Sequence, residues 1–313
     1  KIKQQDNTND AAVYGKMQIL PEGLELTFNP ANTRLNILGD TWRLAENNRI
    51  YIKGNDILFT NVALSHEKQR VALNGIFSYS SDEIAMLTAN DFNLKTIQPL
   101  IDYDIAGVLN GNVAIQEIYQ SALINSDVKI DRFMFEKQFV GDISAETAWD
   151  NAIRKLQINA GISRENQEVV TVVGTYDPAN EESPMNLLTE VQAFPVKLFQ
   201  GFVNDVFSDL GGTATGRVTI KGKTASPNIN GEININNGKL RVDVLNSYLY
   251  FTDKIIITKS SFTASEKGIT LKDAAQNGNS ALLEGGVYSL GNGKYQLAIN
   301  ATMPGNNGFQ LLN

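Results

Sequence analysis

Apolar residues recur at every second position along much of the chain. The longest such run consists of Tyr295, Leu297, Ile299, Ala301 and Met303. Shorter runs with the same spacing lie within residues 24–28, 128–130, 156–162 and 255–257. A spacing of two places one set of side chains on one face of a sheet and the intervening set on the other. The pattern therefore predicts an all-β, mainly antiparallel protein in which each strand has one apolar face.

Asn-Gly dipeptides punctuate these runs. They begin at positions 74, 110, 230, 237, 277, 292 and 307. Both residue types tolerate the positive φ angles of type I′ hairpin turns. Several of the dipeptides lie between alternating runs, and we therefore expect tight turns between neighbouring strands at these points.

Two segments have helical spacing instead. Residues 194–210 predict an amphipathic helix, with Pro195 in its first turn and Gly211 just past its end. Residues 92–101 predict a shorter helix with Ile97, Leu100 and Ile101 on one face, which Pro99 would limit or bend. The apolar face of the longer helix would consist of Phe199, Phe202, Val203, Val206 and Leu210.

The two helical segments open similar stretches of sequence. Phe92-Asn-Leu aligns with Phe194-Pro-Val, and beyond a short insertion Gly107 and Gly111 align with Gly212 and Gly216. Self-similarity of this kind predicts repeated supersecondary units in which each unit packs against its neighbours. We therefore expect a partial first module over residues 1–90, a second over 91–192 and a third over 193–313.

The composition narrows the classes of partner. The chain has 313 residues and a formal net charge of −7. Surfaces that bind nucleic acid or anionic membranes need an excess of Lys and Arg, so neither partner is expected. The absence of cysteine excludes disulfides and cysteine-ligated zinc, and it is compatible with an oxidising compartment. The opening KIKQQDNTND has no apolar signal segment, which predicts an internal piece of a longer protein or a processed product.

Few residues suggest covalent chemistry. His66, the single histidine, lies in the charged stretch LSHEKQR and is interpreted as a solvated loop residue. Asp102 and Asp104 are interpreted as solvated loop acids rather than a catalytic pair. Gly212 and Gly216 lack the Gly-Lys-Ser/Thr ending of a phosphate-binding loop. We therefore expect a protein that is not an enzyme and that has no metal site and no cofactor.

The glycines and alternating residues of one region resemble the TamB family of envelope proteins. The run GGTATGRVTIKGKTASPNINGEININNGKLRV, followed by YLYFTDKIIITKSSF, carries the resemblance most specifically. The segment GITLKDAAQNGNSALLEGGVYSLGNGKYQLAINATM is similar to the start of that family's C-terminal domain. The similarity extends over roughly residues 13–313 and implies an internal fragment.

The resemblance implies a β-groove, also called a β-taco, that is an elongated curled sheet with an apolar inside. Related AsmA-like and bridge-like proteins transfer lipids. The implied function is transport of phospholipid acyl chains across the periplasm of a Gram-negative envelope, in support of outer-membrane biogenesis. The implied partner is an outer-membrane assembly-type β-barrel, TamA or a relative, at the C-terminal end. An inner-membrane anchor would lie in a segment outside this chain.

The inward-facing residues of such a groove are the candidate site, and this assignment depends on the resemblance, since core residues would have the same pattern. The lipid-groove candidates are Val113, Ile115, Val128, Ile130, Phe133, Phe135, Leu156, Ile158, Val218, Ile220, Ile233, Ile235, Leu240, Val242, Ile255, Ile257, Leu297 and Ile299.

Two other classes of function remain open. An adhesin-like β-sandwich array would cover the apolar faces with protein and would be structural or bind a glycan. A chaperone-like factor for outer-membrane protein insertion would offer a free sheet edge to a client strand.

Overall fold

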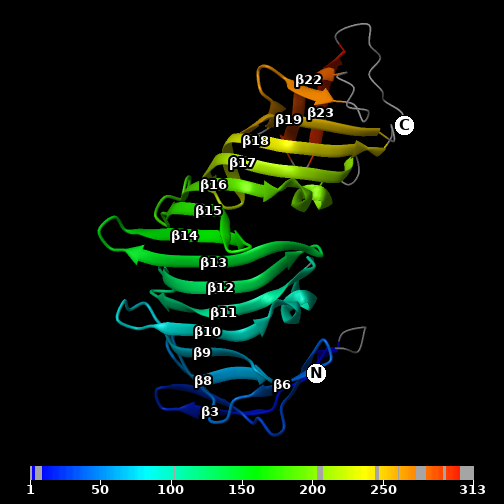
Figure 1. The fold of residues 1–313 in the computed structure, drawn as a ribbon. Helices are drawn as coiled ribbons and strands as arrows, with labels where there is room; N and C mark the ends of the chain where they lie inside the picture. Colours follow the sequence, from blue (N-terminus) through cyan, green and yellow to red (C-terminus); the bar gives the residue numbers. More distant parts are fainter. Residues whose placement is uncertain are drawn as a thin grey trace. The chain divides into compact units, whose positions relative to one another are not determined.

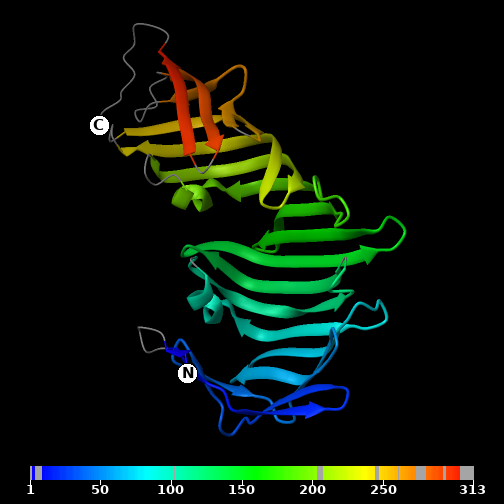
Figure 2. The same cartoon turned by 180° about the vertical axis from the view of Figure 1, so that it is seen from behind.

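The computed structural model describes residues 2–3, 9–101, 103–120, 122–202, 207–243, 247–259, 261–272, 280–291 and 294–303. Figures 1 and 2 show the ribbon from opposite sides. The described residues are almost entirely antiparallel strands joined by short turns, so the predicted all-β class is confirmed. The chain divides into two compact units, Lys1–Ala160 and Gly161–Asn313.

The first unit, here unit 1, is built from strands β1 to β13 and one short helix. Its elements are β1 (Ile2–Lys3), β2 (Asp10–Ala12), β3 (Gly15–Leu20), β4 (Gly23–Phe28), β5 (Arg34–Ile37), β6 (Asp40–Leu44), β7 (Arg49–Lys53), β8 (Asp56–His66), β9 (Gln69–Phe77), β10 (Ala85–Asn93), η1 (Leu94–Leu100), β11 (Ile105–Gln116), β12 (Leu123–Phe135) and β13 (Gln138–Asp150). Strand β14 (Lys155–Arg164) begins in unit 1 and ends in the second unit.

The main sheet of unit 1 is an antiparallel succession of neighbouring strands. Its order is β3-β4-β7-β8-β9-β10-β11-β12-β13. The hairpin of β5 and β6 joins this sheet through β8, while β2 pairs with β5 and with β1. Most pairings therefore join strands that are adjacent in the sequence, as the repeated alternation predicts.

The second unit, here unit 2, has the same local connectivity. Strands β15 to β19 pair in sequence order, β20 and β21 each pair with both β19 and β22, and β22 pairs with β23. Its elements are β15 (Gln167–Tyr176), β16 (Met185–Pro195), η2 (Val196–Phe202), β17 (Phe207–Lys223), β18 (Ser226–Val242), β19 (Ser247–Thr258), β20 (Ser261–Ala264), β21 (Ile269–Lys272), β22 (Ser280–Gly291) and β23 (Lys294–Thr302).

The predicted helix over residues 194–210 is wrong in type and length. Helix η2 is a short 3₁₀ helix, and Leu210 lies in strand β17 rather than on a helical face. A short isolated helix is marginal, whereas the long strand gains a ladder of bonds with β18. The Leu210 N–H donates a hydrogen bond to Gln200 Oε1 at 2.7 Å. This bond gives the N–H an acceptor at the point where the register between β17 and β18 shifts. Val203 and Val206 lie outside the described residues.

The shorter predicted helix also differs. Helix η1 is a 3₁₀ helix that Asn93 caps by accepting the Lys95 N–H at 3.1 Å. Leu94 is its buried residue, whereas the Leu100 side chain is 82% exposed. The predicted face of Ile97, Leu100 and Ile101 is therefore not buried, because a 3₁₀ helix with three residues per turn has a different set of eclipsed positions.

Four of the Asn-Gly dipeptides lie within strands, which corrects the prediction of turns. Those at 74 and 110 lie in β9 and β11, and those at 230 and 237 lie in β18. The dipeptides at 277, 292 and 307 lie outside the described residues. The tight turns contain other pairs, such as Glu67-Lys68 between β8 and β9 and Glu136-Lys137 between β12 and β13.

Several of these Asn residues serve β-bulges instead. Five of the register shifts in the described sheets share one geometry, in which two strand residues lie opposite one residue of the neighbouring strand. The second bulge residue has a φ near +50°, and its N–H donates to the side chain of that opposite residue. The five donor and acceptor pairs are Asn61 with Asn74, Asp91 with Asn110, Arg132 with Asp142, Ala193 with Thr215, and Asn237 with Thr252.

The bulges reproduce the sequence repeat in three dimensions. The bulge at Asp91 in β10 aligns with that at Ala193 in β16, and the bulge at Arg132 in β12 aligns with that at Asn237 in β18. The repeated stretches thus share strand order, helix position and bulge position. The compact units divide at Ala160, inside the second predicted module, so the three-module division stays a prediction.

Candidate functional site: the apolar sheet faces

The candidate residues of β11 and β12 lie on one face of the unit 1 sheet. Residues directly opposite one another in an antiparallel pair point to the same face. Val113 lies opposite Leu87, and Ile115 lies opposite both Ala85 and Ile124. Across the next pair, Val128 lies opposite Ala145 and Ile130 opposite Ile143. Phe133 and Phe135 continue this face, opposite Gly141 and Ile105.

The same face continues from strand to strand as far as β3. Leu73 lies opposite Leu87, Phe59 lies opposite Ile50, and Leu26 lies opposite both Ile50 and Met17. We call this surface the unit 1 face. It includes Met17, Ile19, Leu24, Leu26, Ile50, Ile52, Ile57, Phe59, Leu73, Phe77, Ala85, Leu87, Leu109, Val113, Ile115, Ile124, Val128, Ile130, Phe133, Phe135, Ile143 and Ala145.

Most of the unit 1 face is only partly covered. Of these residues, Ala85 alone is buried, whereas Met17, Ile19 and Leu87 are exposed and the others are half-buried. Phe59 and Phe77 form an edge-to-face ring pair with centroids 5.0 Å apart, yet both remain half-buried. The described part of unit 1 therefore presents apolar area that a closed core would bury.

An aromatic group covers one margin of this face. Trp42 is 2% exposed, and its ring centroid lies 5.8 Å from that of His66 and 6.0 Å from that of Phe92. His66 ends β8, and its Nδ1 lies 3.0 Å from the Thr41 carbonyl oxygen. The interpretation of His66 as a solvated loop residue is therefore wrong, because the adjacent β6 strand brings Trp42 onto it.

In unit 2 the candidate residues form a packed cluster. Ile233 lies opposite Gly216 and Ile255, so the register places the candidates of three strands on one face. Val218, Ile233 and Ile235 are buried, with Ile235 6% exposed. Ile220, Ile255 and Ile257 pack against them, together with Val191, Val196 and Phe251. A second cluster of Leu249, Ile269, Leu271 and Ala281 includes Leu240 at its margin.

Protein therefore covers the apolar face of unit 2 around these residues.

The remaining lipid-groove and helix-face candidates lie outside this packed cluster. Leu156 and Ile158 are half-buried on β14. The side chains of Phe199, Phe202, Val242, Leu297 and Ile299 lie outside the part of the structure that is described. Sequence reasoning missed Leu73, Leu87 and Leu109 as members of the unit 1 face, although each belongs to a run of spacing two.

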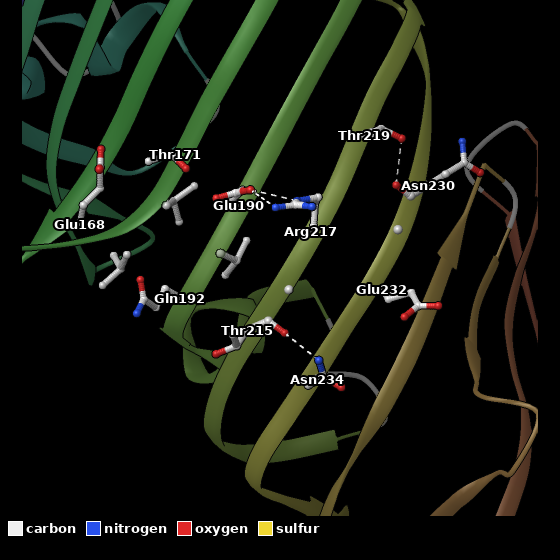
Figure 3. A pocket seen from close by; sticks show the side chains of 15 residues that line it. Glu168, Thr171, Glu190, Gln192, Thr215, Arg217, Thr219, Asn230, Glu232 and Asn234 are labelled. Carbon is white, nitrogen blue, oxygen red and sulfur yellow. Dashed lines mark hydrogen bonds and ion pairs between the residues drawn. The ribbon is translucent and has the colours of Figure 1, made fainter.

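The opposite, polar face of unit 2 carries a shallow hollow of about 790 Å³ (Figure 3). Arg217 Nε donates to Glu190 Oε1 at 2.9 Å across strands β16 and β17. Lys254 pairs with Glu232 at 2.6 Å farther along the same face. Thr171, Thr215, Asn230 and Asn234 also line the hollow. Because its carboxylates at Glu190 and Glu232 are paired, the hollow resembles a solvated ion-pair ladder.

The titratable groups whose pKa values are shifted belong to ion pairs and turns. Lys53 donates to Glu22 and lowers the pKa of that carboxyl, and Lys239 does the same for Asp209. Among the described residues no group of three or more His, Cys, Asp or Glu side chains could hold a metal ion. Asp102 lies outside the described residues, and Asp104 faces Gln98, with Oδ1 3.5 Å from Nε2.

Comparison with known proteins does not assign this chain to a family. No family model, no curated protein and no solved structure matches this chain. Among the described residues there is no helix long and apolar enough to cross a membrane. The candidate function therefore rests on the two sheet faces and on the sequence resemblance.

Proposed function

We propose that the unit 1 face binds lipid acyl chains and that the protein carries phospholipid across the periplasm of a Gram-negative envelope, without covalent chemistry. The observation that carries this proposal is the continuous row of apolar side chains from β3 to β13, nearly all of them half-buried or exposed. A ligand with long methylene chains gains ~0.8 kcal/mol for each methylene that the face removes from water.

The two units suggest different roles. In unit 2 the equivalent residues Val218, Ile233 and Ile235 are covered by protein and support the fold. The repeat aligns these residues with Val113, Val128 and Ile130 of unit 1. Those three side chains lie on the unit 1 face and stay half-buried. We therefore assign lipid binding to unit 1. The partner barrel and the inner-membrane anchor belong to this proposal through the resemblance alone.

A pair of neighbouring substitutions tests the proposal. Val113→Asp places a charge on the unit 1 face, while Asn112→Asp places the same charge on the exposed polar face of the same strand. Each protein would be purified without detergent and analysed by native mass spectrometry, followed by lipid extraction. We expect phospholipid with the unmodified chain and with Asn112→Asp. With Val113→Asp we expect a lipid-bound fraction at least about tenfold smaller, because a buried charge on this face would oppose apolar chains.

Circular dichroism would show whether both variants keep their strand content. Leu87→Asp, on the neighbouring strand and already exposed, provides a second variant with little risk to the fold. Equal lipid loading in folded Val113→Asp and Leu87→Asp would refute the assignment of the face. A stable, lipid-free unmodified chain would instead favour the sandwich, in which protein covers the face.

A further inference from the structure

In the part of the chain that the structure describes, strand β3 is an edge of the unit 1 sheet. Within the described residues it pairs with β4 and with no strand on its other side. Its sequence GKMQIL contains no proline, and its register with β4 is unbroken by a bulge. Proline and bulges are two of the features by which natural edge strands avoid pairing with another chain, and Lys16 is the one charged residue of this short strand.

The open edge has main-chain groups available for bonding. Just before the strand, the Asn29 N–H donates to the Tyr14 carbonyl oxygen at 2.8 Å. Bonded and non-bonded pairs alternate along an antiparallel ladder, so the even-numbered residues of β3 bond to β4. The N–H and C=O groups of Gly15, Met17 and Ile19 consequently point away from β4, toward the open edge.

The same residues carry the most exposed part of the unit 1 face. The Met17 side chain is 67% exposed and that of Ile19 is 84% exposed. Strand β3 thus has both outward-pointing main-chain N–H and C=O groups and exposed apolar side chains. A second strand with the same alternation of apolar and polar residues could bond to the main-chain groups and cover the apolar side chains.

We propose that this edge is an interface between two copies of the chain, in which β3 pairs antiparallel with β3 of the second copy about a two-fold axis through Gln18. In this register Met17 of each copy lies opposite Ile19 of the other. Each of these two pairs exchanges two main-chain hydrogen bonds, because both residues direct their N–H and C=O groups outward. The register needs no change in the pairing of β3 with β4.

Self-pairing also suits the side chains. Opposite residues share a face, so the apolar faces of the two copies become one continuous row through Met17 and Ile19. Lys16 lies opposite Leu20, which keeps the two Lys16 ammonium groups from facing each other directly. The strand is short, and stable dimers usually bury at least ~1,200 Å² in total. The association is therefore weak and depends on concentration.

Cysteine cross-linking tests the register directly, because the chain contains no cysteine. Two residues opposite each other at a non-hydrogen-bonded site have Cα atoms ~4.5 Å apart, within reach of a disulfide. Gln18→Cys should therefore form disulfide-linked dimers under mild oxidation, at least about tenfold faster than Lys16→Cys on the same strand and face. Asn112→Cys, exposed on a central strand, is the control for random collision.

A backbone variant confirms that main-chain pairing is involved. Met17→Pro removes an outward N–H and leaves the bonds to β4, so cross-linking of Gln18→Cys should fall to the level of the controls. Equal cross-linking at all three cysteine positions, or a monomer with no Gln18→Cys dimer at high concentration, would overturn the proposal. So would a native mass spectrum of one chain with a different polypeptide bound and no dimer. None of these results depends on whether lipid binds.

Discussion

Individual carboxylates in this protein stabilise turns rather than a reactive centre. Asp150 Oδ1 accepts hydrogen bonds from the Ala152 N–H at 2.8 Å and the Ile153 N–H at 3.3 Å in the turn after β13. These backbone bonds hold the pKa of the Asp150 carboxyl below its ordinary value. The ionised form is therefore favoured in the folded chain.

The lowered pKa predicts a pH dependence of stability. A depressed folded-state pKa stabilises the fold above the unfolded pKa of 3.8 and loses that contribution as the pH falls through the folded pKa. We expect Asp150→Asn to unfold at a lower urea concentration than the unmodified chain near pH 6, with the difference shrinking below about pH 4. Urea midpoints at both pH values measure this, and a difference that stays constant with pH would contradict it.

At the scale of the elements, the bulges are the feature that recurs. Asn110→Ala leaves the Asp91 N–H without its acceptor at 2.8 Å, and Thr215→Ala leaves the Ala193 N–H of unit 2 without its acceptor at 3.0 Å. We expect each to lower the free energy of unfolding by ~0.5–1.5 kcal/mol, the usual contribution of one such bond. Chemical denaturation measures the change. Asn112→Ala, two residues from Asn110 and exposed, should have a smaller effect.

The bulges also show where sequence reasoning reaches its limit. Spacing of two predicted the strands and the shared face of Val113, Ile115, Val128 and Ile130. It could not separate an Asn-Gly turn from an Asn that accepts a bulge N–H, since both use the same residue types. At Gly75, a Cβ atom would lie 2.0 Å from the Ile84 carbonyl oxygen, so this glycine permits close strand approach rather than a turn.

The candidate site was predictable to a similar degree. The alternation identified which residues share a face, but exposure depends on what packs against that face from distant strands. Ile235 and Ile130 occupy aligned positions in the repeat, yet Ile235 is buried and Ile130 is half-buried. The spacing of two in the sequence carries no information on this difference in burial. The short 3₁₀ helices were missed because the spacing of Phe199 to Leu210 fits a helix and a strand end equally well over so few residues.

At the scale of the whole molecule, the two compact units differ in how their apolar faces are used. A packed cluster stabilises unit 2 through Val218, Ile233 and Ile235, whereas unit 1 retains half-buried side chains along its sheet. Pairing between strands adjacent in sequence makes stability a largely local property, as in repeat proteins. Loss of one cluster should therefore be felt mainly in its own unit.

Ile235→Ala tests this expectation. Removing a buried side chain of this size costs ~2–5 kcal/mol, because it leaves a cavity. We expect faster amide hydrogen exchange in peptides from β17 and β18, with the exchange of β11 and β12 unchanged. Val128→Ala, at a half-buried position of unit 1, should instead speed amide hydrogen exchange in β11 and β12 and leave β17 and β18 unchanged. The increase in exchange should be smaller than that caused by Ile235→Ala. Equal loss of protection in both units after Ile235→Ala would mean that the chain unfolds as one cooperative body, and the apolar face of unit 1 would then depend on the packed cluster of unit 2 for its stability.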